Sequence, residues 1–538
     1  MTHQVQSESN PIAAGLSLPE NVLPDFIALN ARWRPNTTAL VFGQQRLAWG
    51  ALDRRINQVA HGLIALGIRK GQTVGMLLPN AQESLEIMLG ILRSGAVLVP
   101  LSTMLTPPVL ATMARDAGLR AIFVHRDYAG VLHPDAADCA GMDLLPNAWI
   151  AVDHTGKNWT AYGTWVSAQP DCNPMVSLTG ADRFNIIYSS GTTGVPKGIV
   201  HSHAARFNFA YARVADFRVS RDSVALITTP LYHNGSMLTL LPALLVGAAI
   251  VVMPRFDASE ALALIEEEHC THTFMVPSQY VEMVAHAEFR KRDLSSLVMA
   301  LTAGAAIRSD TKTAVLDVLG DAFMELYGAT EGFSITIRAH EMRERMDSVG
   351  RPVIGVDVRI VSDDDKELAV GEVGEICGRS PYLMSGYHNQ PALTAESFWH
   401  DAFGKAYYRS GDLGRYDDEG YFHISGRKKE MIISGGINIY AQDLESVVHQ
   451  HPDVADCAVI GAAHPKWGET PIAFVVAATD ARFRRTPADG AAITAWANER
   501  LGKFQRISEL RFIDALPRNA MGKVVKQELK AQLAGEDS

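Results

Sequence analysis

The chain has 538 residues, of which 47% are hydrophobic and 20% charged, so its composition is that of an ordinary folded protein of three or four domain-sized units. The 59 acidic residues outnumber the 49 basic ones, and the resulting net charge of −10 disfavours nonspecific binding of nucleic acid. The five cysteines lie far apart, without the spacing of a disulfide framework or a zinc site. We therefore expect a protein of the reducing cytoplasm.

Two segments could be mistaken for membrane or targeting signals. The N-terminus lacks a basic region followed by a continuous apolar run, so we expect no signal peptide. Residues 224–253 contain no Lys, Arg, Asp or Glu, but Pro, Gly, His and Asn interrupt them. Because a membrane span needs about 20 mostly uninterrupted apolar residues, this segment predicts a buried strand, loop and helix instead.

Helical and strand-like patterns alternate from about residue 50. Helical spacing of apolar residues occurs at 51–66, 81–93 and 107–117. Short apolar runs typical of buried strands lie at 74–78, 96–101, 121–124, 224–227, 249–253, 273–276, 298–302 and 323–327. Strands separated by helices predict α/β architecture with two doubly wound layers, because the strands then run parallel and helices cover both faces.

The last third of the chain has a different texture. Residues 353–424 show alternating segments and acidic turns, which predict a small β subdomain. After Gly426, strand patterns at 431–434, 458–460 and 472–476 mix with helical patterns at 441–450, 491–501 and 525–533. We expect a domain of residues 1–426 followed by a mobile α+β domain of residues 427–538.

A glycine- and hydroxyl-rich segment at residues 188–198 follows a strand-like run at 184–187. Its glycines allow backbone N–H groups to point at an anion, its hydroxyls donate further hydrogen bonds, and Lys197 adds positive charge. The spacing is not that of the P-loop, because two residues instead of four separate Gly191 from Gly194. On these residues alone, a phosphate-binding loop and a merely flexible loop are both open.

Four further segments decide between these alternatives: YGATE at 327–331, YRSGD at 408–412, GRKKE at 426–430 and PRNAMGK at 517–523. Together with the loop, and in this order and spacing, they resemble the core motifs of the adenylate-forming superfamily of acyl- and aryl-CoA synthetases, peptide-synthetase adenylation domains and luciferases. The resemblance covers roughly residues 20–530. It implies that a carboxylate attacks the α-phosphate of ATP to give acyl-AMP, which a thiol, usually that of coenzyme A, then attacks.

The resemblance also implies roles for individual residues. Bringing two anions together requires a cation, since two unit charges 4 Å apart repel by about 4 kcal/mol at an effective dielectric of 20. Lys523 matches the family's catalytic lysine and Glu331 its magnesium-coordinating acid, and one carboxylate plus phosphate oxygens suits Mg²⁺. Asp412 is expected to accept hydrogen bonds from the ribose, Tyr327 to stack on adenine, and Arg427 to reach the ribose or a phosphate. The expected nucleotide and metal contacts also include Ser189, Ser190, Gly191, Thr192, Thr193, Gly194, Lys197, Gly328, Ala329 and Thr330.

The thioester half-reaction is expected to use a second orientation of the last domain. Lys429 aligns with the family's hinge residue, and Gly435 and Gly436 would allow close approach of pantetheine. Weaker candidates for contacts with coenzyme A are Trp467, Arg93, Phe504 and Arg506, each of which could equally be a surface or packing residue.

His233, in the segment PLYHNG, resembles the residue that gates the family's acyl site, although a core histidine is the ordinary alternative. No Asp appears in residues 224–253 to pair with a substrate ammonium, so an amino acid substrate is disfavoured. The expected wall of the acyl pocket is small or apolar and comprises Met237, Val276, Ser278, Thr302, Ala303, Gly304, Ala305 and Ala329.

The favoured prediction is an AMP-forming acyl-CoA ligase for a fatty or other apolar carboxylic acid. An aryl-CoA ligase for benzoate- or cinnamate-like acids is the nearest alternative. A luciferase-like oxygenase and an enzyme that loads a carrier protein share the adenylation step and stay open. We expect ATP, Mg²⁺, coenzyme A and a small carboxylic acid as ligands, and no nucleic acid or membrane span. Whether the chain forms a homodimer is left open.

Overall fold

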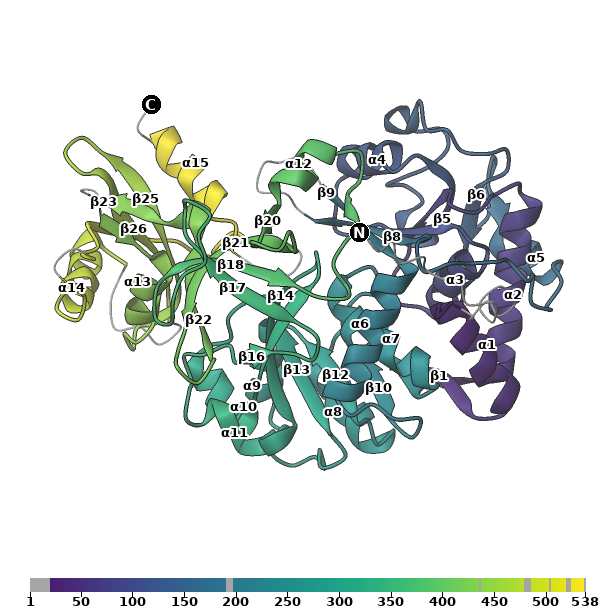
Figure 1. Cartoon of the computed structure of the whole chain (residues 1–538), viewed down its shortest axis with the longest axis horizontal. Coiled ribbons are helices and arrows are strands. Elements are labelled where there is room, and N and C mark those ends of the chain that lie inside the picture. Colours follow the sequence, from purple (N-terminus) through teal and green to yellow (C-terminus); the bar gives the residue numbers. More distant parts are fainter. Residues whose placement is uncertain are drawn as a thin grey trace, which may run out of the picture.

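The computed structural model describes residues 20–189, 197–434, 437–478, 485–502, 505–518 and 524–536, which form four β-sheets with helices packed against them (Figure 1). The first two sheets are large and share one hydrophobic core, the third is a smaller β subdomain, and the fourth belongs to the C-terminal segment. In Figure 1 the C-terminal elements gather at one end of the molecule, opposite the helices of the first sheet.

The first large sheet has eight strands in the order β19-β9-β8-β4-β3-β5-β6-β7. Its strands are β3 (Thr73–Leu77), β4 (Val97–Pro100), β5 (Leu119–His125), β6 (Trp149–Val152), β7 (Thr160–Ala161), β8 (Arg183–Ser189), β9 (Lys197–Ser202) and β19 (Gly386–Tyr387). The helices between them are α2 (Trp49–Ala65), α3 (Gln82–Arg93), α4 (Pro107–Asp116) and α5 (Tyr162–Ser167). The strands and helices predicted between residues 51 and 124 are thus confirmed, with ends shifted by at most two residues.

The edge of this sheet departs from the all-parallel expectation. Strand β8 pairs with β4 in parallel, but β8 and β9 form an antiparallel hairpin that brings Tyr188 opposite Gly198. The connection at 190–196 is too short for a crossover helix, so the chain must reverse. The predicted phosphate-binding segment therefore joins the tips of two paired strands.

The second large sheet has nine strands in the order β16-β15-β14-β13-β12-β10-β11-β1-β2. They are β1 (Thr38–Phe42), β2 (Gln45–Ala48), β10 (Val224–Ile227), β11 (Ala249–Val252), β12 (His272–Met275), β13 (Met299–Ala303), β14 (Phe323–Ala329), β15 (Phe333–Arg338) and β16 (Arg351–Pro352). All five strands predicted between 224 and 327 are present and run parallel to one another. The segment 224–253 is indeed a strand, a loop, a helix and a strand.

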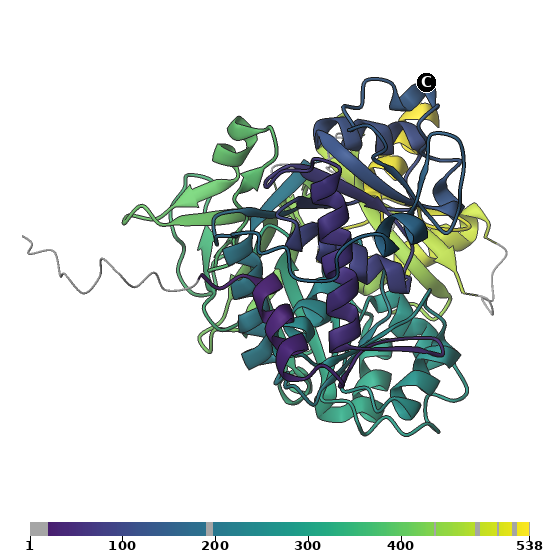
Figure 2. The ribbon, with the colours of Figure 1, turned by 90° about the vertical axis from the view of Figure 1, so that its right-hand side faces the viewer.

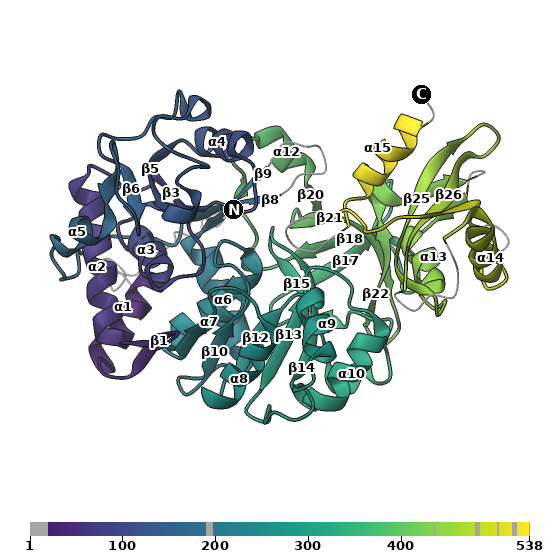
Figure 3. The same cartoon turned by 180° about the vertical axis from the view of Figure 1, so that it is seen from behind.

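Two groups of helices cover this sheet. The helices α1 (Leu23–Trp33), α6 (His203–Asp216) and α7 (Met237–Val246) contribute to the core shared with the first sheet. The helices α8 (Ala258–Glu267), α9 (Pro277–Ala285), α10 (Ser309–Leu319) and α11 (Ala339–Met342) pack on the other face. Figure 3 shows α8, α9 and α10 from this side, and Figure 2 shows α1 and α2 in front. The second sheet is thus buried on both faces, as its apolar strands predict.

The third sheet confirms the predicted β subdomain. Its strands are β17 (Asp357–Val361), β18 (Gly374–Arg379), β20 (Phe398–His400), β21 (Ala406–Tyr416) and β22 (Phe422–Arg427), and α12 (Pro391–Glu396) lies before β20. A single turn of 3₁₀ helix, η5 (Lys428–Glu430), links β22 to the fourth sheet.

The fourth sheet comprises β23 (Ile432–Ser434), β24 (Ile437–Ile439), β25 (Val454–His464), β26 (Gly468–Ala477) and β27 (Glu509–Phe512). Its helices are α13 (Ala441–Val448), α14 (Pro487–Asn498) and α15 (Lys526–Glu536). The prediction placed the start of α14 four residues too late. Thr486 caps this helix in a capping box with Asp489, and Pro487 occupies its first turn, a start signal that the apolar spacing alone does not reveal.

In the part of the chain that the structure describes, no helix is long and apolar enough to cross a membrane. The five cysteines are all free.

Candidate active site

A cavity of about 670 Å³ lies between the two large sheets. The first sheet contributes Ile187, Tyr188 and His201, and the second contributes Phe274, Leu326 and residues at the ends of β13 and β14. Strands β12, β13 and β14 are parallel neighbours that end at the same edge, where α/β sheets form their ligand sites. The remaining wall comes from residues 102–113, from α6, from the segment 233–238, and from Thr330, Gly332, Phe333, Ser334, Tyr382 and Arg518.

The backbone at the end of β14 comes unusually close to its partner strand. Gly328 lies opposite Ser334, and a Cβ atom at position 328 would lie 2.3 Å from the carbonyl oxygen of Phe333. Any other residue would therefore push the strands apart. Gly328, Ala329 and Thr330 all line the cavity.

Glu331 follows in the turn between β14 and β15. Its Oε1 atom accepts a hydrogen bond from the Tyr387 hydroxyl at 2.8 Å, and its carbonyl oxygen accepts one from the Met384 N–H at 2.6 Å. The ammonium of Lys197 lies 5.3 Å from the centre of the Tyr387 ring. Burial, and then the Glu331 charge, raise the pKa of Tyr387. The Glu331 carboxylate, in the turn after β14, and the Lys197 ammonium, at the start of β9, thus both lie beside Tyr387.

This donor set fits a magnesium ion only if a phosphate completes the coordination. No cluster of three or more His, Cys, Asp or Glu suited to a metal occurs within residues 20–536 where they are described. A single carboxylate such as Glu331 is what Mg²⁺ uses when it shares nucleotide phosphates and keeps several waters.

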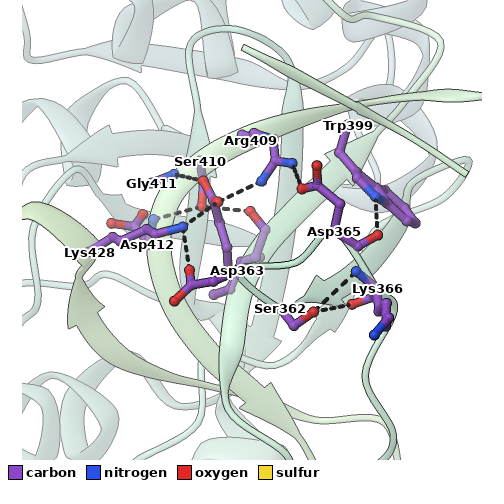
Figure 4. A network of polar contacts seen from close by, with 12 residues as sticks. Ser362, Asp363, Asp365, Lys366, Trp399, Arg409, Ser410, Gly411, Asp412 and Lys428 are labelled. Carbon is purple, nitrogen blue, oxygen red and sulfur yellow. Dashed lines mark hydrogen bonds and ion pairs between the residues drawn. The ribbon is translucent and has the colours of Figure 1, made fainter. Parts of the chain in front are cut away.

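A second polar group links the second sheet to the β subdomain. The Tyr327 hydroxyl donates to Asp412 Oδ2 at 2.7 Å, and Arg427 Nε lies 2.7 Å from Asp412 Oδ1. Burial, and then the charge of Asp412, raise the pKa of Tyr327, so the phenol stays protonated and donates. The backbone N–H of Asp412 donates to Ser410 Oγ, which orients the carboxylate (Figure 4). Three predicted nucleotide residues are therefore brought into contact.

In the basic cluster at 427–429, Lys428 is paired with acidic residues, whereas Lys429 is exposed to solvent. Lys428 pairs with Asp363 at 2.8 Å and Glu375 at 3.3 Å, which anchors it to the β subdomain (Figure 4). Lys429 is exposed and lies in η5, between β22 and β23. The chain thus passes from an anchored residue to an exposed one where the predicted hinge lies.

His233 lies on the cavity wall with Asn234 and Gly235, just before α7. Burial lowers its pKa to about 4, so the imidazole is neutral near pH 7. Its ring packs 4.5 Å from that of Tyr232, whose hydroxyl accepts a hydrogen bond from Thr103. A neutral, half-buried imidazole at the wall is compatible with a gate and with a packing role.

The predicted acyl wall is only partly found at the cavity. Ala303, Gly304 and Ala329 line it together with His233. Met237 is buried in the core shared by the two sheets, and Thr302 is fully buried in β13, on the opposite face to Ala303. Val276 precedes α9 and Ser278 lies in its first turn, and neither they nor Ala305 belong to the described lining.

Several lining residues have no counterpart in the prediction. They include His201 of β9, Arg206, Phe209 and Arg213 of α6, Ser334 of β15, and Tyr382. A sequence signal for three of them exists: Arg206, Phe209 and Arg213 have the i, i+3, i+7 spacing of one helix face, and two charges on a buried face are unusual.

The candidates for coenzyme A contacts are scattered. Arg93 is buried in α3, where it pairs with Asp53 and donates to Asn57 Oδ1 at 2.6 Å and to the carbonyl oxygen of Pro24 at 3.0 Å. These contacts tie α3 to α1 and α2, so we leave Arg93 out of the proposed site. Trp467, at the turn between β25 and β26, is 47% exposed, and Arg506 is also exposed.

Some predicted residues lie outside the described residues: Ser190, Gly191, Thr192, Thr193, Gly194, Gly435, Gly436, Phe504 and Lys523. Their neighbours are placed, however. Ser189 ends β8 and Lys197 begins β9. Arg518, five residues before Lys523, lines the cavity and pairs with Asp456.

Comparison with known proteins agrees with this geometry. Residues 27–388 match the AMP-binding enzyme family, and residues 443–523 match the AMP-binding enzyme C-terminal domain. The chain is 33% identical to a feruloyl-CoA synthase from Amycolatopsis sp. over 93% of this chain and 96% of that protein. It is 31% identical to a long-chain-fatty-acid–CoA ligase from Mycobacterium tuberculosis, over 90% and 93%.

Among solved structures, ATP-bound MatB from Rhodopseudomonas palustris superimposes with a TM-score of 0.83 at 26% identity, covering 94% of this chain and 98% of that one. The described fold, the cavity and the two family matches together show that this chain belongs to the AMP-binding, adenylate-forming enzymes, as an AMP-forming acid–CoA ligase family member.

Proposed function

We propose that this enzyme activates a carboxylic acid with ATP to form acyl-AMP and pyrophosphate, and then transfers the acyl group to coenzyme A with release of AMP. The observation that carries the proposal is that Tyr188 at the end of β8 and residues 328–330 after β14 line one large cavity. Tyr327, the residue before this segment, donates to Asp412, which pairs with Arg427.

In the proposed complex, the hydroxyl-rich loop after Ser189 and the ammonium of Lys197 hold the β- and γ-phosphates. Asp412 is positioned to accept hydrogen bonds from the ribose, with Arg427 balancing its charge at 2.7 Å. Glu331 would hold Mg²⁺ together with phosphate oxygens, and the ion would neutralise part of the phosphate charge when bound. Tyr327 donates to Asp412 and presents its ring as one wall of the adenine site.

The acid binds in the cavity with its carboxylate directed toward the α-phosphate. Lys523 would neutralise the two approaching anions from the segment that follows Arg518, which already lines the cavity. As the carboxylate oxygen forms its bond to phosphorus, the bond to the pyrophosphate oxygen breaks.

For the second half-reaction we propose that the part of the 427–538 domain that follows Lys429 moves as one body about this residue. This residue is exposed, while Lys428 next to it stays anchored to Asp363 and Glu375. The movement would withdraw Lys523 and bring Gly435 and Gly436 beside the pantetheine path. The thiolate then attacks the acyl carbonyl and AMP leaves. Trp467, Phe504 and Arg506 stay candidates for holding coenzyme A.

The substrate is proposed to have an apolar body. Apart from its polar groups, the cavity is walled by Met104, Leu105, Val109, Met113, Leu238 and Phe274. A fatty or other apolar acid fits this wall. An aryl acid is the second candidate, because the rings of Phe209, Phe274, Phe333 and Tyr382 all line the cavity and can stack on a flat substrate. The placement in the cytoplasm and the use of coenzyme A instead of a carrier protein also remain proposals.

The test is a pyrophosphate-release screen over alkyl and aryl carboxylic acids, with and without coenzyme A, with thioester detected by mass spectrometry. We expect acid-dependent release of pyrophosphate and thioester only when coenzyme A is added. Light emission with luciferin and oxygen, or acyl transfer to a carrier protein but never to coenzyme A, would contradict the proposed second half-reaction.

A further inference from the structure

Two arginines of α6 lie on the wall of the cavity although the rest of their helix face is buried. Arg206 and Arg213 are each only 2% exposed, and both are lining residues. They are seven residues apart, two turns of helix, and both guanidinium groups lie against the ring of Phe209, at 5.5 and 4.1 Å from its centre. Two buried positive charges therefore share one side of the site.

The hydrogen bonds of these arginines are incomplete. Arg206 Nε donates to Asn185 Oδ1 at 2.7 Å, and Arg213 Nη2 donates to Ser334 Oγ at 2.8 Å. Arg206 Nη2 and Arg213 Nη1 are buried and have no hydrogen-bond partner among the described residues. A guanidinium carries five N–H donors and stays charged, so these donors are costly unless an acceptor reaches them.

The side chains that accept hydrogen bonds from these two guanidinium groups are neutral. Asn185, Ser334 and Phe209 are neutral, and the hydroxyl of Tyr382 bonds to Ser334 Oγ at 2.9 Å while its ring stacks on Arg213 at 4.4 Å. His201, on β9, bonds to Asn185 and to the carbonyl oxygen of Thr330, and burial, followed by the Arg206 charge, lowers its pKa well below the usual range.

Asp216 lies one turn beyond Arg213 on α6, where burial raises its pKa and the charges of Arg338 and Arg213 act against that rise. Its Oδ1 atom pairs with Arg338 at 3.2 Å, and no hydrogen bond joins it to Arg213 in the described chain. Burial, and then the charge of Arg213, lower the pKa of Arg206 to about 9. Buried charges are normally paired, and breaking such a pair is strongly destabilising.

We infer that the acid activated by this enzyme carries a second anionic group, a carboxylate, which binds between Arg206 and Arg213 beside Phe209. This inference rests on the proposed function and narrows it to a dicarboxylic acid with an apolar body. The substrate would supply the acceptor that both guanidinium groups lack, and the apolar wall would hold the carbon skeleton between its two carboxylates. The aromatic rings fix the guanidinium planes, so the pair is organised before the substrate arrives.

The test on the unmodified enzyme compares matched acids that differ only in the second carboxylate: suberate against octanoate, and para-carboxycinnamate against para-methylcinnamate. We expect kcat/KM for pyrophosphate release to favour the diacid of at least one pair by on the order of 100-fold, the range of hydrogen bonds to charged groups. Equal or better use of the monoacid in both pairs would overturn the inference while leaving the proposed function intact. Pyrophosphate release with none of the four acids or any other acid would overturn the proposed function and the inference with it.

Variants separate binding of the second carboxylate from other roles of the arginines. Arg213→Gln and Arg206→Gln should lower kcat/KM for the diacid on the order of 100-fold and change that for the monoacid little. Arg213→Lys, which keeps the charge but loses the fork of donors, should retain part of the preference. Arg218→Gln, in an exposed arginine just beyond α6, is the matched control and should keep the full preference.

Two results would contradict the inference here. Equal losses for diacid and monoacid would mean that the pair contacts the reacting carboxylate or only supports the fold. Restoration of monoacid activity by added acetate would mean that the site takes a separate anion. If the glutamine variants do not fold, as judged by thermal melting, the preference of the unmodified enzyme and of Arg213→Lys decides the question.

Discussion

The two sides of the cavity differ in how they are built. On the side of Thr330 and Glu331, the predicted nucleotide residues stand in short motifs within strands or in the turn directly after a strand. On the side of α6, the wall is assembled from single residues such as Arg213, Ser334 and Tyr382, which are far apart in the sequence and meet only through packing. The residues proposed for adenylation therefore come from short sequence motifs. The residues proposed to select the acid come from tertiary contacts between distant parts of the chain.

The largest effect is expected on the motif side. Lys523→Ala should lower the rate of acyl-AMP formation about 100- to 1,000-fold, because the positive charge that offsets two approaching anions is lost. Pyrophosphate release measures this step. Thioester formation from supplied acyl-AMP should be nearly unchanged, and Lys530→Ala, in an exposed lysine of α15, is the control. Equal loss of both half-reactions would contradict the role given to Lys523.

Substitution of the proposed hinge residue, Lys429, is expected to affect the thioester half-reaction and to spare acyl-AMP formation. Lys429→Pro should slow thioester formation at least about tenfold while acyl-AMP still forms, because proline restricts the backbone on which the domain movement depends. Lys429→Ala removes the charge but keeps the backbone free, so it should behave like the unmodified enzyme. Single-turnover measurements of the two half-reactions distinguish these variants, and unchanged thioester turnover in Lys429→Pro would remove the hinge from the account.

A smaller effect is expected at the ribose site. Asp412→Asn should raise the KM for ATP about tenfold, since a charge-assisted acceptor is replaced by a neutral amide beside Arg427. The KM for the acid should change little, because the acid is proposed to bind on the other side of the cavity. Asp418→Asn, in an exposed turn after β21, is the matched control. An equal rise in both KM values would mean that the variant disturbs the whole cavity.

The division also explains which features could be predicted from the sequence. Buried parallel strands such as β10 and β12 were predicted almost to the residue, because a short apolar run bounded by turns has few alternatives. The family resemblance implied nucleotide roles for Asp412 and Tyr327, but the hydrogen bond between them was not predicted. Met237 and Thr302 were assigned to the acyl wall but lie in the core, because the face a side chain takes depends on packing that the sequence pattern does not contain.

The smallest effect concerns His233. Burial lowers the pKa of His233 to about 4 in the folded protein, against about 6.5 for a free histidine. Between pH 6.5 and 4 the imidazole is therefore protonated in the unfolded chain but neutral in the folded one. The free energy of unfolding should therefore fall as the pH drops from about 6.5 to 4. In His233→Gln this fall should be smaller by about 1–2 kcal/mol, measured by urea titration at several pH values. An identical pH dependence in the variant would show that the imidazole is not neutral at the cavity wall.

The most direct test of the central claim, that an acyl-adenylate forms in the cavity between the two large sheets, is isotope exchange between labelled pyrophosphate and ATP without coenzyme A. The account predicts that label enters ATP only when an accepted carboxylic acid is present, and that Lys523→Ala slows the exchange about 100- to 1,000-fold. Exchange that proceeds equally without any acid, or no exchange with any acid that the enzyme converts to a thioester, would contradict it.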